Sequence, residues 1–143
     1  MQLLELSIYA EERDIPVYYL SMRRRRQAGL SVDDGKNGAV LMNKTLIRHA
    51  ESVEKVFLAH ELGHCETASF YFGANCAADG AKNHQINRCE RRAWNWAYET
   101  LVPPRRLAYA VKRRHLLELW DLADYFDVPE WFMRRVIRYY KGI

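Results

Sequence analysis

Apolar residues recur at helical spacing along most of this chain. A repeat of apolar positions every three or four residues predicts helices over residues 3–13, 50–71, 84–101 and most of 104–141. Pro103-Pro104 ends the third of these, because a residue that precedes proline disfavours the helical conformation. The last stretch breaks near Asp127-Val128-Pro129, which separates two helical patterns, residues 116–126 and 129–140.

Strand-like patterns are short and confined to the first third of the chain. Residues 17–22 follow Pro16 and are rich in β-branched and aromatic side chains. Residues 39–42 and 45–47 are apolar runs separated by Asn43-Lys44, which is hairpin spacing, although lysine is not the preferred second turn residue. The polar stretches 31–38 and 73–83 indicate loops. The sequence therefore predicts an α+β fold, with a small N-terminal antiparallel sheet and a helical C-terminal half.

Length and composition favour one compact domain over residues 1–143. About half the residues are apolar and 13% are aromatic, which is too high for a disordered chain. We find no apolar run near the roughly 18 residues that span a bilayer, so we expect no membrane association. Cys65, Cys76 and Cys89 are odd in number and lack CxxC spacing. They are typical of free, buried thiols in a reducing cytoplasm.

The formal net charge of +4 comes entirely from the C-terminal tail. Residues 1–102 hold 13 basic and 13 acidic residues, whereas residues 103–143 hold nine basic and five acidic ones. Such a basic helical tail is compatible with a nucleic-acid footprint or with an ordinary solvated surface. The Arg23–Arg26 run is expected to be a solvated loop, with an acidic patch on a partner as the alternative.

The candidate chemistry lies in residues 60–64, which read His-Glu-Leu-Gly-His. Residues four apart share one face of a helix, so His60 and His64 can bind one zinc ion. Glu61 lies about 100° further around the axis. It flanks the ion without binding it and can act as the general base of hydrolysis. Two core histidines bonded to backbone carbonyls are the alternative. Gly63 is costly inside a helix, which suggests close approach of another backbone or of a substrate.

A third zinc ligand is expected from the helix predicted over residues 84–101. Glu90 is the only charge in an apolar stripe of that helix, and a buried carboxylate must be paired or bound to a metal. The small residues Ala93 and Ala97 would allow close packing against the 50–71 helix. An ion pair of Glu90 with a neighbouring arginine, Arg91 or Arg92, is the alternative. Weaker candidate ligands are His84, Asp79, Glu66 and Cys65.

Three segments together resemble one known family. LAHELGHCETASFY, ERRAWNWAYETLVP and LADYFDVPEWFMRRVI are similar to the ImmA/IrrE family of bacterial and phage zinc metallopeptidases. The resemblance covers nearly the whole chain. The length of the chain is similar to that of the small family members encoded by phages or mobile elements. It implies a zincin-like fold in which His60, His64 and Glu90 hold zinc and Glu61 is the general base. Characterised members cleave transcriptional repressors, so a helix-turn-helix repressor is the implied substrate.

The residues that would assist hydrolysis are less well defined. Tyr71, His84 and Tyr98 are possible oxyanion donors, and the sequence does not choose among them. The strand predicted over residues 39–42 is a candidate edge that pairs with an extended substrate, or else an ordinary half-buried strand.

The basic tail leaves a second function open. The tail has small and apolar residues at the core positions of a helix-turn-helix, namely Ala123, Val128 and Met133. In such a motif the second helix would present Arg134, Arg135 and Arg138 to a DNA groove. The favoured interpretation is that these helices complete the peptidase core or contact the repressor, with burial of Trp120, Phe126, Trp131 and Phe132. The alternative function is a zinc-containing DNA- or partner-binding regulator without essential hydrolysis. A toxin-type protease is a third possibility.

Overall fold

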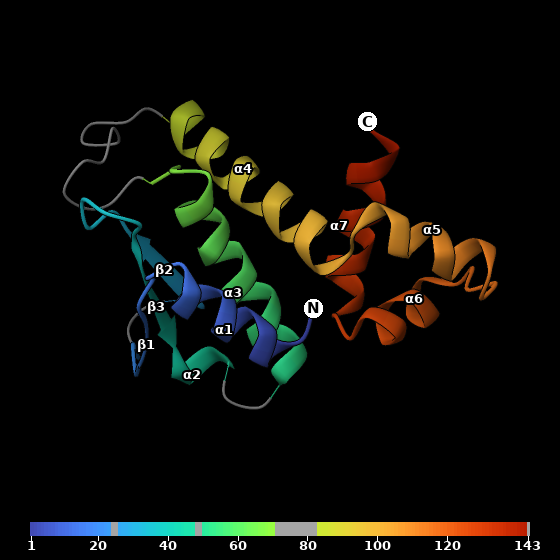
Figure 1. Cartoon of the computed structure of the whole chain (residues 1–143), viewed down its shortest axis with the longest axis horizontal. Helices are drawn as coiled ribbons and strands as arrows, with labels where there is room; N and C mark the ends of the chain where they lie inside the picture. Colours follow the sequence, from blue (N-terminus) through green and yellow to red (C-terminus); the bar gives the residue numbers. More distant parts are fainter. Residues whose placement is uncertain (24–25, 48–49, 71–82, 143) are drawn as a thin grey trace.

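The computed structural model describes residues 1–23, 26–47, 50–70 and 83–142. Three strands near the N-terminus are followed by a long helical part (Figure 1). The elements in chain order are α1 (Leu3–Glu12), β1 (Val17–Leu20), β2 (Gly29–Val32), β3 (Ala39–Asn43), α2 (Lys44–Ile47), α3 (Glu51–Glu66), α4 (Asn83–Leu101), α5 (Pro104–Lys112), α6 (Leu119–Phe126) and α7 (Glu130–Lys141). The α+β prediction is confirmed. Over the described parts of the chain, none of the helices combines the length and apolar character needed to cross a membrane.

The sheet is mixed, so the prediction of an antiparallel sheet is wrong in detail. Its strand order is β1-β3-β2, with β1 parallel and β2 antiparallel to the central β3. The strand β2 overlaps the stretch expected to be a loop. Gly29 and Ser31 are its buried positions, and neither is apolar, so the alternation that signals a strand is missing. Because β3 is central, residues 39–42 do not form the candidate edge for substrate pairing, and the alternative of an ordinary partly buried strand is confirmed.

The expected second strand at residues 45–47 is instead the short helix α2. Asn43 ends β3 with a buried side chain whose Oδ1 accepts hydrogen bonds from the backbone N–H groups of Met22 and Thr45. Its Nδ2 donates to the carbonyls of Met22 and Gln27. Asn43 therefore acts as a helix cap and a loop anchor, which is why Asn43-Lys44 begins a helix where hairpin spacing suggested a turn.

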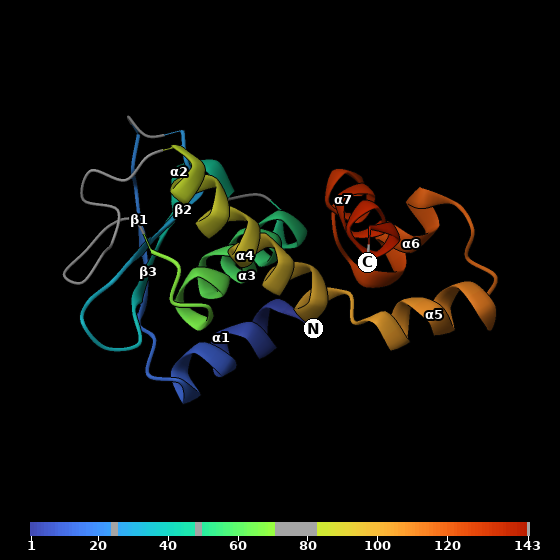
Figure 2. The ribbon, with the colours of Figure 1, turned by 90° about the horizontal axis from the view of Figure 1, so that it is seen from above.

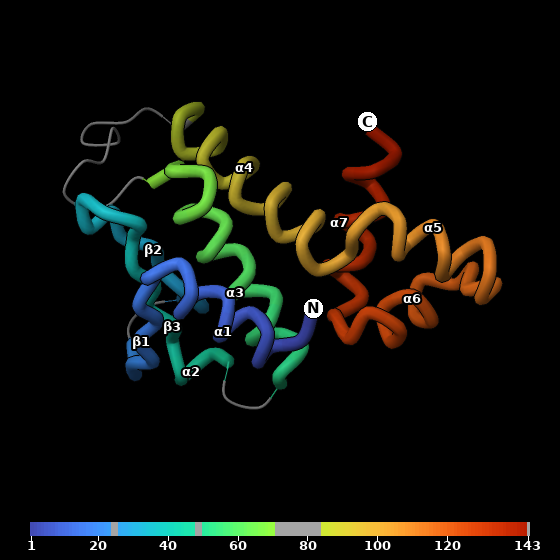
Figure 3. The backbone as a smooth tube through the Cα atoms, viewed as in Figure 1, coloured from blue at the N-terminus to red at the C-terminus, as the bar shows by residue number. Residues whose placement is uncertain are grey.

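The helix α3 is the centre of the molecule. It contacts β2 and β3 on one side, α1 on another, and α4 along much of its length (Figures 1 and 3). Every residue from Lys55 to Cys65 is buried except the half-buried Phe57. The helix ends at Glu66, five residues before the predicted end, because Ala68 adopts a left-handed conformation with φ of 49°. The bond from Ser69 N–H to the His64 carbonyl closes this turn.

The C-terminal helices lie to one side of the sheet and α1, and α7 packs against α4 (Figure 2). Phe126, Val128, Phe132 and Val136 are buried in the same apolar cluster as α3 residues. Asp127 forms the α6–α7 turn with φ of 52°, the left-handed conformation that glycine usually supplies. As expected, Ala123 and Met133 are buried, but the expected burial of Trp120 and Trp131 is wrong, since they are 55% and 37% exposed.

Candidate metal centre

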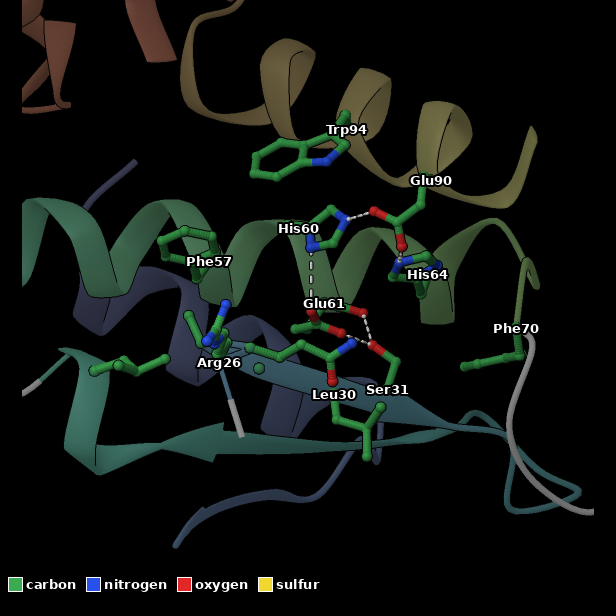
Figure 4. A pocket seen from close by; sticks show the side chains of 14 residues that line it. Arg26, Leu30, Ser31, Phe57, His60, Glu61, His64, Phe70, Glu90 and Trp94 are labelled. Carbon is green, nitrogen blue, oxygen red and sulfur yellow. Dashed lines mark hydrogen bonds and ion pairs between the residues drawn. The ribbon is translucent and has the colours of Figure 1, made fainter. Parts of the chain in front are cut away.

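The two histidines of the HExxH sequence point to one carboxylate. His60 and His64 are one turn apart on α3, and both are buried. Their Nε2 atoms lie 2.9 and 3.0 Å from the two carboxylate oxygens of Glu90 on α4 (Figure 4). The ligand atoms of the three residues lie within 4.8 Å of one another. The structure therefore brings together the three side chains that the sequence suggested as metal ligands.

Close packing of α3 against α4 brings Glu90 to the histidines. A Cβ placed on Gly63 would lie 2.5 Å from the Ala93 carbonyl oxygen and 3.0 Å from Ala93 Cα. Ala93 and Ala97 are fully buried at this crossing. The expectation that Gly63 permits close approach of another backbone is confirmed, and the backbone is that of α4.

Each imidazole is held by its other ring nitrogen. His64 Nδ1 donates to the Ser69 carbonyl at 2.7 Å, and His60 Nδ1 lies 3.1 Å from Glu61 Oε1. A carbonyl only accepts, so Nδ1 of His64 carries a proton and Nε2 is left for the cluster. Histidines that bind metals are held by such contacts in the same way. The donor set of two imidazoles and one carboxylate thus fits a metal ion.

The same contacts affect the protonation of His60. Burial alone lowers the pKa of His60, but hydrogen bonds to Glu61 and Glu90 outweigh it and raise the pKa to about 9. The imidazole is therefore largely protonated at neutral pH when no cation lies in the cluster. A metal ion bound there would have to displace this proton.

Glu61 lies beside the cluster and is bound to β2. Its carboxylate accepts a short hydrogen bond from Ser31 Oγ, which also lies 2.9 Å from the Glu61 carbonyl. A Cβ on Gly29, two residues earlier on the same strand, would lie 2.7 Å from Glu61 Cγ. Ser31 was missed by sequence reasoning, because the residue fell in a stretch expected to be a loop and no motif marks it.

A cavity of about 470 Å³ opens beside the cluster. Its walls include His60, Glu61, His64 and Glu90, together with Gly29, Leu30, Ser31, Phe57, Phe70 and Trp94 (Figure 4). Trp94 stacks on His60, with ring centroids 4.1 Å apart and an interplanar angle of 21°. Trp94 lies one turn after Glu90 on α4, but nothing in the sequence assigned it to the site.

The weaker candidates that the structure describes lie outside the cluster. His84 is exposed at the start of α4, and Glu66 forms an ion pair with Arg13 at 3.1 Å. Cys65 is buried with its sulfur close to Gly38, where an added Cβ would lie 2.8 Å from it. Asp79 and Tyr71 lie outside the described residues, as does Cys76. Tyr98 packs among Trp94, Phe132 and Tyr139.

One of three comparisons with known proteins finds a match. A family model described as the IrrE N-terminal-like domain, of a peptidase family, matches residues 10–137. The match begins in α1 and ends in α7, so it includes the sheet, the histidine helix and most of the basic tail. No curated protein and no solved structure gives a significant match.

Proposed function

The chain belongs to the peptidase family of the IrrE N-terminal-like domain, and from that premise we propose that it is a zinc-dependent endopeptidase that cleaves a transcriptional repressor. The family supports a metallopeptidase type of function. The observation that carries the proposal is the convergence of His60, His64 and Glu90 on one point at the edge of a cavity. Two imidazoles and a carboxylate are a common ligand set of catalytic zinc, with the fourth position open.

The chain's own residues can divide the work of hydrolysis. His60, His64 and Glu90 would hold zinc, which when bound supplies Lewis-acid polarisation of a carbonyl and activation of water. Glu61 takes the proton of the attacking water and passes it to the leaving amine. Ser31 and Gly29 support this role, because they fix the position of the Glu61 carboxylate against β2.

We infer that the cavity accepts an extended peptide. Residues 29–31 of β2 line the cavity, and among the described residues only β3 pairs with this strand. The other edge of β2 can therefore accept the backbone of a substrate in β-pairing. Leu30, Phe57 and Trp94 give this cleft an apolar wall suited to a large apolar side chain. The family resemblance suggests a helix-turn-helix repressor of a phage or mobile element, encoded beside this protein, as the substrate.

Metal content tests the ligand assignment. We expect one zinc per wild-type chain and a loss of at least tenfold in zinc affinity for Glu90→Ala. Glu99→Ala is the matched control, because Glu99 lies on α4 but is exposed and bonded to Tyr139. Unchanged zinc content in Glu90→Ala would refute the third-ligand assignment.

Cleavage tests the role of Glu61. Purified protein and zinc are incubated with the neighbouring repressor, and products are identified by mass spectrometry. We expect Glu61→Gln to retain zinc and to lose roughly 10²–10⁴-fold in cleavage rate. Cleavage that survives undiminished would rule out the general-base role. If neither the wild type nor Glu61→Gln cleaves the repressor, and the chain binds duplex DNA in a salt-dependent way, the alternative function of a DNA-binding regulator without hydrolysis would be favoured.

A further inference from the structure

The basic tail reaches the candidate metal centre through one arginine. The Arg135 guanidinium carbon, on α7, lies 4.2 Å from the centroid of the Trp94 ring. It also lies 5.8 and 6.0 Å from the rings of Tyr98 and Trp131. These distances are typical of cation–π contacts. Arg135 is therefore engaged with α4, whereas Arg134 and Arg138 of the same helix are exposed.

Trp94 transmits this contact to a histidine of the cluster. The indole stacks nearly parallel on the His60 imidazole, at 4.1 Å and 21°. Phe57 and Trp131 meet the indole edge-on, at 6.2 and 6.1 Å with interplanar angles of 68° and 83°. Contacts on its faces and edges thus fix the plane of Trp94, and Trp94 in turn fixes the plane of His60.

We propose that Trp94 and Arg135 are positioning residues that hold the His60 imidazole in its metal-binding orientation. This inference rests on the proposed role of His60 as a zinc ligand. The second side-chain torsion of histidine is broad, so a single hydrogen bond leaves the ring free to rock. The Glu61 contact constrains His60 Nδ1, and the stack removes the rocking motion, so that Nε2 keeps facing Glu90.

The arrangement also gives the tail a role in the site. The favoured interpretation of residues 103–143 was that they complete the core, and Phe132, Met133 and Val136 of α7 are indeed fully buried. Arg135 links that helix to the metal centre through Trp94. On this account α7 sets metal affinity in addition to stabilising the fold.

The test measures the zinc dissociation constant of the full chain by competition with a chelator of known affinity. We expect Trp94→Leu to weaken zinc binding about 10–100-fold, the effect usual for residues that orient a metal ligand. Arg135→Gln, one contact further away, should weaken it roughly threefold. Trp94→Phe retains an aromatic face, and Arg135→Lys retains a cation. Both variants should therefore bind zinc almost as tightly as the wild type. Arg134→Gln is the matched control and should bind zinc like the wild type.

Melting temperatures of the metal-free proteins separate positioning from folding. If Trp94→Leu does not fold, the Arg135→Gln and Arg135→Lys pair still decides the matter. Wild-type zinc affinity in Arg135→Gln, or equal losses in Arg135→Gln and Arg135→Lys, would overturn the inference while leaving the proposed function intact. Failure of the wild type itself to bind zinc would overturn the proposed function, and the positioning role with it.

Discussion

Replacing Gly63 by alanine sets two physical effects against each other. Glycine in a helix interior costs about 1 kcal/mol relative to alanine, so helix propensity alone predicts a more stable protein. The new Cβ would lie 2.5 Å from the Ala93 carbonyl oxygen, whereas ordinary contact begins at about 3.4 Å. The backbone of α4 must therefore retreat by about 1 Å.

The clash should outweigh the gain in propensity. Overpacking a core costs about 1–3 kcal/mol, and the upper end applies here because the obstructing atoms belong to a helix backbone that cannot rotate away. We expect a net loss of about 1–2 kcal/mol in the free energy of unfolding. The retreat also carries Glu90 away from His60 and His64, so zinc affinity should fall at least tenfold.

Denaturant unfolding of the metal-free protein and chelator competition measure the two losses. Gly142→Ala is the control, because its Cβ would meet nothing closer than the Tyr139 carbonyl oxygen at 3.5 Å. It should change stability by less than about 0.5 kcal/mol. A Gly63→Ala protein that is as stable as the wild type and binds zinc equally well would refute the reasoning.

Three further predictions concern buried and titratable groups. Lys55→Ala should cost about 2–4 kcal/mol in denaturant unfolding, because it empties a buried site and leaves a carbonyl at the end of α6 without its donor. Asp127, which pairs with Lys55, is 55% exposed, so Asp127→Asn should lower the free energy of unfolding by less than about 1 kcal/mol. Equal losses in Lys55→Ala and Asp127→Asn would contradict this order. Burial raises the pKa of the Cys65 thiol from 9.0 to about 12. At pH 8 this thiol should therefore be alkylated roughly 1000-fold more slowly in native protein than in unfolded protein. Equal alkylation rates, measured by mass spectrometry, would contradict its burial. Burial and the hydrogen bond to Glu99 raise the pKa of Tyr139 to about 12, so its proton stays on in the folded state between pH 10 and 12. The contribution of Tyr139 to stability is therefore present below pH 10 and is lost as pH rises through 12. The absorbance of the wild type minus that of Tyr139→Phe reports the Tyr139 phenol, and a titration of this difference near pH 10 would refute the shift.

Periodicity predicted the parts of the site that lie on long helices. The i, i+4 spacing of His60 and His64 and the lone charge of Glu90 in an apolar stripe depend only on the repeat of the α-helix. Gly63 indicated that a backbone or a substrate comes close to this turn, and the small Ala93 and Ala97 indicated close packing of the two helices. Because these signals are local, the sequence alone indicated three residues that the structure brings within reach of one metal ion.

The strands and the tail depended on information that local patterns do not contain. The buried face of β2 consists of Gly29 and Ser31, so no apolar alternation marked it. The strand order β1-β3-β2 places β1 beside β3, in parallel, and strand order is not encoded in a window of a few residues. Helical spacing placed Arg135 on a polar face of its helix, but the indole it covers lies 41 positions earlier in the sequence, on a different helix.

The central claim is a zinc-dependent hydrolysis in which Glu61 moves the proton. The most direct measurement adds zinc back to metal-stripped protein and follows cleavage of the repressor against zinc bound per chain. We predict that the rate rises from background and saturates at one zinc per chain, and that Glu61→Gln binds the same zinc without a comparable rise. Full cleavage by the metal-stripped protein, or an equal rise in Glu61→Gln, would contradict the account.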